Sequence, residues 1–119
     1  MILLTGGAGF IGSNFLKLLN DDGIRDIVIA DNLGKQDGLA GKWRTLLGKQ
    51  FREIIPKEAI IPFIEHNRRD LTAVVHLGAC SSTQEMDMDF LMRNNVQLSQ
   101  NIIRLCAEFA MRCIYARSA

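Results

Sequence analysis

The sequence predicts an α/β protein built on a doubly wound parallel sheet of about five strands. Short apolar runs alternate with longer segments of helical periodicity, and a glycine-rich turn joins the first run to the first helix. The chain has 119 residues, is 48% hydrophobic and carries 14 Lys and Arg against 13 Asp and Glu. This balance is typical of a single globular domain.

The composition argues against several classes of partner. A net charge of +1 with interspersed signs provides no broad basic surface for nucleic acid and no polybasic segment for a membrane. The opening apolar run, Met1 to Leu4, is too short for a signal-peptide core or a membrane span, so we expect a cytoplasmic protein. No metal site is expected, because the cysteines and histidines lack ligand spacing. The cysteines, expected to be free and reduced, are Cys80, Cys106 and Cys113.

The first half of the chain contains three predicted strands and one clear helix. The strands are Ile2–Thr5, Asp26–Asp31 and the weaker Phe51–Ile55. Residues 10–19 place their apolar side chains on one helical face, and Gly23 is expected to end this helix in the left-handed conformation. Residues 32–48, rich in glycine and basic residues, are expected to form a loop with at most a short helix near Trp43.

The second half adds two strands and two helices. Pro56 opens a helix over residues 57–66, and residues 71–77 form the clearest strand pattern. A long amphipathic helix over residues 88–109 leads to a fifth strand at residues 111–116. The last strand is expected to be an open edge, so the sheet is expected to be incomplete on its C-terminal side.

A glycine motif lies between the first strand and the first helix. Gly6, Gly9 and Gly12 have the spacing G-x-x-G-x-x-G. The first glycine permits a tight turn, the second lets the backbone approach a pyrophosphate, and the third lets the helix pack near the strand. The phosphate would lie at the helix N-terminus, where unpaired N–H groups and the helix dipole favour an anion. These features indicate a Rossmann-type dinucleotide-binding domain over residues 1–119.

Asp31 strengthens this interpretation over that of a plain structural turn. It ends the second predicted strand about 20 residues after the motif, where an acidic side chain meets the adenosine ribose. The rival phosphate-binding P-loop is excluded, because neither Gly34-Lys35-Gln36 nor Gly41-Lys42-Trp43 has the required hydroxyl residue after the lysine.

A second group of small and hydroxyl residues, Leu77 to Thr83, follows the fourth strand. Ligands of doubly wound sheets bind outside the carboxyl ends of strands, so this loop favours a cofactor or substrate role, although a cluster of helix N-caps is the simpler alternative. Cys80 is expected to be a packed small residue and not a nucleophile. His66 and His76 are expected to be satisfied or solvent-facing. Asn94 and Asn95, unfavourable within a helix, suggest an amide that is useful near the cofactor.

Five segments together resemble the extended short-chain dehydrogenase/reductases, and among them the N-terminal part of the heptose 6-epimerase family. They are T-G-G-A-G-F-I-G-S-N, Asp31-Asn32-Leu33, Lys42-Trp43-Arg44, H-L-G-A-C-S-S-T and R-N-N-V. The first segment is shared by the whole superfamily, whereas G-A-C-S-S-T is much narrower. The resemblance covers essentially the whole chain but only the cofactor half of the family enzyme.

The resemblance implies a set of cofactor-binding residues. They are Gly6, Gly9, Phe10, Ile11, Gly12, Asp31, Asn32, Lys42, Lys57, Leu77, Gly78, Ala79, Cys80, Ser81 and Asn94. On the substrate side, the position of the hydroxyl-rich loop after the fourth strand indicates Ser81, Ser82 and Thr83. An acid after the second strand usually favours NAD. Relatives of this kind nevertheless use NADP, and Lys42 with Lys35 or Arg44 offers positive charge that could offset Asp31, so NADP is the expected cofactor.

Enzymes of the family that this chain resembles invert the configuration at C6 of a heptose by transient oxidation and reduction. The product is a precursor of the lipopolysaccharide inner core. The family's acid/base is a tyrosine in Y-x-x-x-K. Here the only tyrosine is Tyr115, and no such motif exists. Ser118 matches the family's active-site serine, beside an unusual Arg117. We therefore expect a truncated domain that lacks the substrate domain and is inactive alone, and that would act on a sugar nucleotide as a homo-oligomer if complete.

Two alternatives to this assignment remain open. One is another nucleotide-sugar epimerase or dehydratase of the same superfamily. The other is a non-catalytic dinucleotide-binding module.

Overall fold

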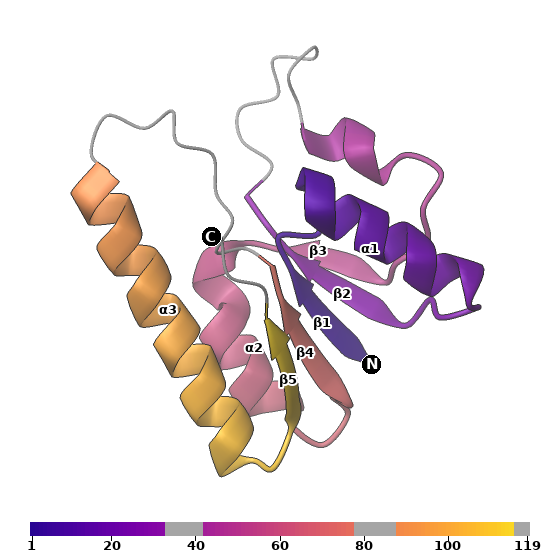
Figure 1. The fold of residues 1–119 in the computed structure, drawn as a ribbon. Coiled ribbons are helices and arrows are strands. Elements are labelled where there is room, and N and C mark those ends of the chain that lie inside the picture. Colours follow the sequence, from indigo (N-terminus) through magenta and orange to yellow (C-terminus); the bar gives the residue numbers. More distant parts are fainter. Residues whose placement is uncertain (33–41, 78–87, 116–119) are drawn as a thin grey trace.

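A computed structural model describes residues 1–32, 42–77 and 88–115, without the side chains of 42–43 and 88–95. The sheet has five parallel strands in the order β3-β2-β1-β4-β5, which confirms the predicted fold class (Figure 1). The strands are β1 (Ile2–Thr5), β2 (Ile27–Ala30), β3 (Glu53–Ile55), β4 (Ala73–His76) and β5 (Arg112–Tyr115). The helices are α1 (Phe10–Asp21), α2 (Ile60–Asn67) and α3 (Met88–Glu108), with short 3₁₀ helices η1 (Lys42–Leu46) and η2 (Lys57–Ala59).

The two faces of the sheet pack against different helices (Figure 1). Leu3 of β1 belongs to the apolar core shared with α2 and α3, whereas Leu4 belongs to the core shared with α1 and η1. This alternation follows from the two-residue period of a strand. All four residues of β2 are buried, as expected of a strand covered on both faces.

The chain enters the sheet at its centre and then builds outward in both directions. After β1 it adds β2 and β3 on one side, and then crosses over to add β4 and β5 on the other. Thr5 is in register with Ala30 of β2 and with His76 of β4, so three strands end together at this point. A topological switch point of this kind is where open α/β sheets bind ligands.

Several elements differ in length from the prediction. Leu71 is not in a strand, because its N–H bonds the Asn67 carbonyl and so closes the end of α2. Strand β3 begins only at Glu53, which pairs with Val28. The predicted helix over residues 57–66 begins as 3₁₀ helix η2 and becomes α-helical at Ile60. Helix α1 runs on to Asp21.

Gly23 ends helix α1 as the sequence predicts. Its φ is +82°, in the left-handed region, and its N–H bonds the Asn20 carbonyl at 2.9 Å. The N–H of Ile24 then bonds the Leu19 carbonyl at 2.9 Å, so the last carbonyls of the helix are satisfied by the turn that leads to β2.

None of the helices in the described part of the chain combines the length and the apolar character that a membrane span requires.

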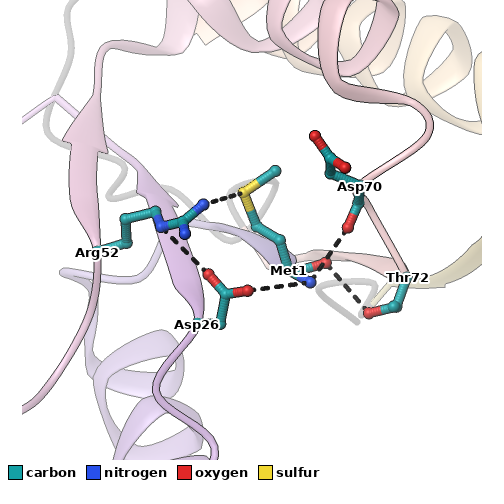
Figure 2. Close-up of polar contacts among 5 residues, drawn as sticks. All are labelled: Met1, Asp26, Arg52, Asp70 and Thr72. Atoms are coloured by element: carbon teal, nitrogen blue, oxygen red, sulfur yellow. Dashed lines mark hydrogen bonds and ion pairs between the residues drawn. The ribbon is translucent and has the colours of Figure 1, made fainter.

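A cluster of polar contacts around Met1 joins the strands at their N-terminal ends, the edge of the sheet opposite to the switch point (Figure 2). The Met1 amine lies 3.5 Å from Asp26 Oδ2, and Arg52 Nε lies 3.3 Å from Asp26 Oδ1. The Met1 carbonyl accepts hydrogen bonds from the N–H and hydroxyl of Thr72, at 2.8 and 3.1 Å. These contacts join the segments that precede β2, β3 and β4.

We expect Asp26→Asn to have little effect on stability. Asp26 and Arg52 are more than half exposed, and exposed ion pairs contribute about 0–1 kcal/mol. Urea denaturation should show a loss of less than about 1 kcal/mol in the free energy of unfolding. A loss well above that value would mean that the cluster stabilises the fold far more than its exposure suggests.

Candidate functional site

The glycine motif forms a tight turn at the carboxyl end of β1. Gly6 has a φ of +72°, which L side chains rarely adopt. Its N–H bonds the Ala30 carbonyl at 2.8 Å, and its carbonyl accepts the Gly9 N–H at 3.0 Å. The turn is therefore anchored on strand β2 at one end and closed on itself at the other.

Gly12 allows the first turn of helix α1 to lie directly against this glycine turn. A Cβ on Gly12 would lie 2.0 Å from the Gly6 carbonyl oxygen and 2.7 Å from the Gly6 carbonyl carbon. Gly7 is also restricted, because its Cβ would lie 2.8 Å from Ile29 Cγ2 on strand β2. The close approach of helix and strand expected of the third glycine is thus present.

Gly9 is the N-cap of α1 and occupies a more open position. It has an extended backbone, with φ −78° and ψ 176°, and a Cβ there would meet only the Gly6 oxygen at 3.3 Å. The next two residues, Phe10 and Ile11, are 83% and 52% exposed although both are apolar. The helix N-terminus therefore presents backbone N–H groups and its positive dipole end beside two exposed apolar side chains, an arrangement suited to an anion such as a pyrophosphate.

Two polar side chains hold the peptide groups of Ala8 in the middle of the turn. Asp31 Oδ2 accepts the Ala8 N–H at 3.0 Å, and the Thr45 hydroxyl of η1 donates to the Ala8 carbonyl at 2.7 Å. Asp31 is only 3% exposed, and its own N–H bonds the Ile55 carbonyl of β3 at 3.0 Å. The Asp31 carboxylate thus stabilises the glycine turn through its hydrogen bond with Ala8. The sequence alone did not suggest this contact.

Asn32 and Lys57 also come together beside this end of β2. The Asn32 side-chain oxygen accepts the Lys57 N–H at 3.2 Å, so the start of η2 lies next to the residue that follows Asp31. Lys42 is the first residue of η1. Leu77 follows β4, and its N–H bonds the Thr5 carbonyl at 3.1 Å. These residues of the predicted cofactor set therefore lie on elements at the same edge of the sheet.

Part of the predicted site lies outside the described residues. This part comprises Gly78, Ala79, Cys80, Ser81, Ser82, Thr83 and Ser118. Asn94 belongs to α3, but its side chain is outside the description too. Their roles remain predictions.

A buried histidine links the turn to helix α3. His76 Nδ1 lies 2.5 Å from the Thr5 hydroxyl, and Nε2 lies 2.8 Å from the Ser99 hydroxyl of α3. His76 is therefore a satisfied histidine, one of the two alternatives the sequence favoured. Burial lowers its pKa below 6.5, and the charge of Lys57 lowers it further.

We expect His76 to make the protein less stable in mild acid. Its pKa is lower in the folded than in the unfolded chain, so its contribution to stability is complete above pH 6.5 and disappears as the pH falls through the folded value. For one proton, the free energy of unfolding should fall by no more than about 1.4 kcal/mol per pH unit. Urea denaturation between pH 5 and 7.5 should show that the free energy of unfolding falls as the pH drops below 6.5 in the wild type. The variant His66→Gln, a change at an exposed histidine, should show the same fall. A His76→Asn variant with the same slope would contradict this assignment.

The described cysteines, Cys106 and Cys113, are free thiols. Cys106 is buried, and burial together with the neighbouring Cys113 raises its pKa to about 12, so it stays protonated. Within the described ranges, no cluster of three or more His, Cys, Asp or Glu residues could hold a metal ion.

The sequence profile of the NAD dependent epimerase/dehydratase family matches residues 2–119. The chain belongs to this family. Its sequence is 42% identical to ADP-L-glycero-D-manno-heptose-6-epimerase of Nitratidesulfovibrio vulgaris over 121 aligned residues, which cover all of this chain and 36% of that protein. The same-named enzyme of Fusobacterium nucleatum is also 42% identical, with 35% of its length covered. The chain thus spans little more than a third of these relatives.

A solved structure supports the same relationship. The Helicobacter pylori ADP-L-glycero-D-manno-heptose-6-epimerase superimposes with a TM-score of 0.74 and 28% identity, covering 99% of this chain and 39% of that one. The match includes the five-stranded sheet and its flanking helices, so the glycine turn described above occupies the first βα connection of a family fold.

Proposed function

We propose that this chain is the dinucleotide-binding part of a sugar-nucleotide epimerase that inverts C6 of an ADP-bound heptose. The observation that carries the proposal is the glycine turn at the switch point of the sheet, where a Cβ on Gly12 would overlap backbone. The identity of 42% to two heptose 6-epimerases supports the substrate class. The cytoplasm, a sugar-nucleotide substrate and a homo-oligomeric assembly of the whole enzyme belong to the same proposal, as does the supply of lipopolysaccharide inner-core precursors.

The residues of this edge fit a nicotinamide dinucleotide. Gly9 and the N-terminal N–H groups of α1 would hold the pyrophosphate, with Phe10 and Ile11 covering it. Asp31 and Asn32 would lie at the adenosine ribose. When bound, the nicotinamide would supply the hydride acceptor and donor of the epimerisation.

We propose NADP as the preferred form. One oxygen of the Asp31 carboxylate accepts the Ala8 N–H, whose dipole offsets part of the negative charge that would repel a 2′-phosphate. Lys42 and Lys57, which begin η1 and η2, are the proposed sources of compensating positive charge. Tighter binding of NAD than of NADP at low salt would contradict this preference.

The 119-residue chain is expected to bind the cofactor without turning over substrate. Its only tyrosine is Tyr115, and the sequence contains no Y-x-x-x-K, the motif that supplies the acid/base in the family it resembles. Ser118 is the remaining proposed catalytic position.

A thermal-denaturation series tests the binding proposal. A ligand at about 100 times its dissociation constant stabilises the folded state by about 2.7 kcal/mol, which raises the melting temperature of a domain this size by roughly 10 °C or more. We expect millimolar NADP to produce such a shift, and AMP alone to produce a smaller one. No shift with either NADP or NAD, in a sample that melts cooperatively, would contradict the proposal.

A further inference from the structure

His76 lies where strand β1, strand β4 and helix α3 meet. Its ring nitrogens contact one hydroxyl on each side, Thr5 at 2.5 Å and Ser99 at 2.8 Å. The contact with Ser99 is partly buried, whereas Thr5 is 1% exposed and His76 is 2% exposed, so the contact between these two side chains is shielded from water. Shielded contacts of this kind are costly to break, because the groups left behind cannot be solvated.

The chemistry of the three side chains lets one ring bridge two elements. A neutral imidazole has one donor and one acceptor nitrogen, and each hydroxyl can donate or accept, so both contacts can be satisfied at once. An apolar side chain at this position would remove the hydrogen bonds to both hydroxyls. An asparagine is shorter, and could reach Thr5 but not Ser99.

Thr5 connects this bridge to the candidate cofactor site. It is the last residue of β1, and the next residue is Gly6, whose φ of +72° sets the direction of the glycine turn. The Thr5 carbonyl accepts the Leu77 N–H at 3.1 Å, so the backbone of Thr5 is also fixed to the end of β4. The ring contact is therefore one of the contacts, together with this backbone hydrogen bond, that fix Thr5 directly before the turn, and its loss is expected to alter the start of the turn.

We propose that His76 is a positioning residue that holds the glycine turn in its dinucleotide-binding geometry by bridging Thr5 to Ser99 of helix α3. The proposal rests on the proposed function only for its effect on affinity. Its effect on the geometry of the turn is independent of any ligand. His76 itself needs no contact with the cofactor.

The variant Ser99→Ala tests the bridge with a small change remote from the turn in sequence. It removes one hydroxyl and leaves the Thr5 contact in place. We expect the backbone amide resonances of Gly6 and Gly7 to shift in the ligand-free protein, and the dissociation constant for NADP to rise about 3- to 10-fold, the range of one weakened hydrogen bond. The control Thr72→Val removes a hydroxyl hydrogen bond at the opposite edge of the sheet and should change neither quantity.

A double-mutant cycle distinguishes positioning from general stability. The variant His76→Asn already lacks the contact with Ser99. Adding Ser99→Ala to it should therefore change neither the amide shifts nor the dissociation constant any further. If Ser99→Ala lowers only the free energy of unfolding, and leaves the amides of the turn and the dissociation constant unchanged, the bridge is merely structural and the proposal is overturned.

The pH dependence of the same resonances provides a further readout. We expect the Gly6 and Gly7 amides to titrate together with the His76 ring, at a midpoint below 6.5, and to lose this transition in His76→Asn. The described titratable groups that act on or lie beside the ring are Lys57 of η2, whose charge lowers its pKa, and Tyr115, its register partner on β5. A ring titration that leaves both amides unmoved would count against the bridge.

The outcomes separate this inference from the proposed function. If the wild type binds neither NADP nor NAD, the proposed function fails, and the ligand-free amide shifts still decide whether His76 positions the turn. If the wild type binds but Ser99→Ala changes neither the amides nor the affinity, the bridge is wrong and the proposed function stands.

Discussion

Replacing Gly12 with alanine is expected to destabilise the fold by about 3 kcal/mol or more, near the upper end of the range for forcing an extra carbon into a packed site. The added Cβ would lie 2.0 Å from the Gly6 oxygen and 2.9 Å from the Gly7 Cα. These are backbone atoms in a turn held on β2, so no side chain can rotate away to relieve the overlap. Helix α1 must move off the turn, and its contacts with the sheet weaken.

Thermal and urea denaturation would measure this loss. A chain of 119 residues lies between the size classes that change by roughly 4–8 and 2–4 °C per kcal/mol, so at about 4 °C per kcal/mol we expect Gly12→Ala to melt about 10 °C or more below the wild type. Gly9→Ala is the matched control, because its Cβ meets only one oxygen at 3.3 Å and its φ of −78° suits any residue. Equal stability of Gly12→Ala and Gly9→Ala would show that the helix does not pack against the turn as described.

Replacing Gly9 with valine is expected to have the opposite pattern, with a smaller loss of stability than Gly12→Ala, because its Cβ lies 3.3 Å and not 2.0 Å from the Gly6 oxygen, and a large loss of binding. The side chain at the N-cap of α1 would project into the space where a pyrophosphate approaches the helix N-terminus. Losing two charge-assisted hydrogen bonds costs about 3 kcal/mol, which corresponds to a rise of about 100-fold in the dissociation constant.

Calorimetric titration with NADP would measure this effect, with circular dichroism to establish that Gly9→Val is folded. Asp26→Asn at the far edge of the sheet is the control and should bind as the wild type does. Wild-type affinity in a folded Gly9→Val protein would mean that the dinucleotide does not bind at this turn.

Much of the fold could be predicted from the sequence because strong local patterns mark it. The apolar runs, the periodicity of helices α1 and α3, and Gly23 as a terminator all depend on side chains close together in the chain. The ends of β3 and β4 could not be predicted, because they depend on register with distant strands. Leu71, for example, looks like a strand residue but serves to close α2.

In the candidate site too, the features set by neighbouring residues could be predicted, and the contacts between distant residues could not. The G-x-x-G-x-x-G spacing predicted the tight turn at Gly6 and the close packing at Gly12, both consequences of local backbone geometry. The contacts of Asp31 with Ala8 and of His76 with Ser99 were missed, since each joins residues more than 20 positions apart. A polar residue inside an otherwise apolar strand pattern, as His76 is, was the available signal for a buried polar contact.

The most direct test of the central claim is a titration of the ¹⁵N-labelled chain with NADP, followed through its backbone amide resonances. If the glycine turn holds the pyrophosphate, the largest shifts should fall on Gly9, Phe10 and Ile11, with a smaller shift at Asp31, and they should saturate at one common dissociation constant. Amides at the opposite edge, such as those of Asp26 and Arg52, should remain unchanged. Saturable shifts confined to that opposite edge, or none at all at millimolar NADP and NAD, would contradict the account.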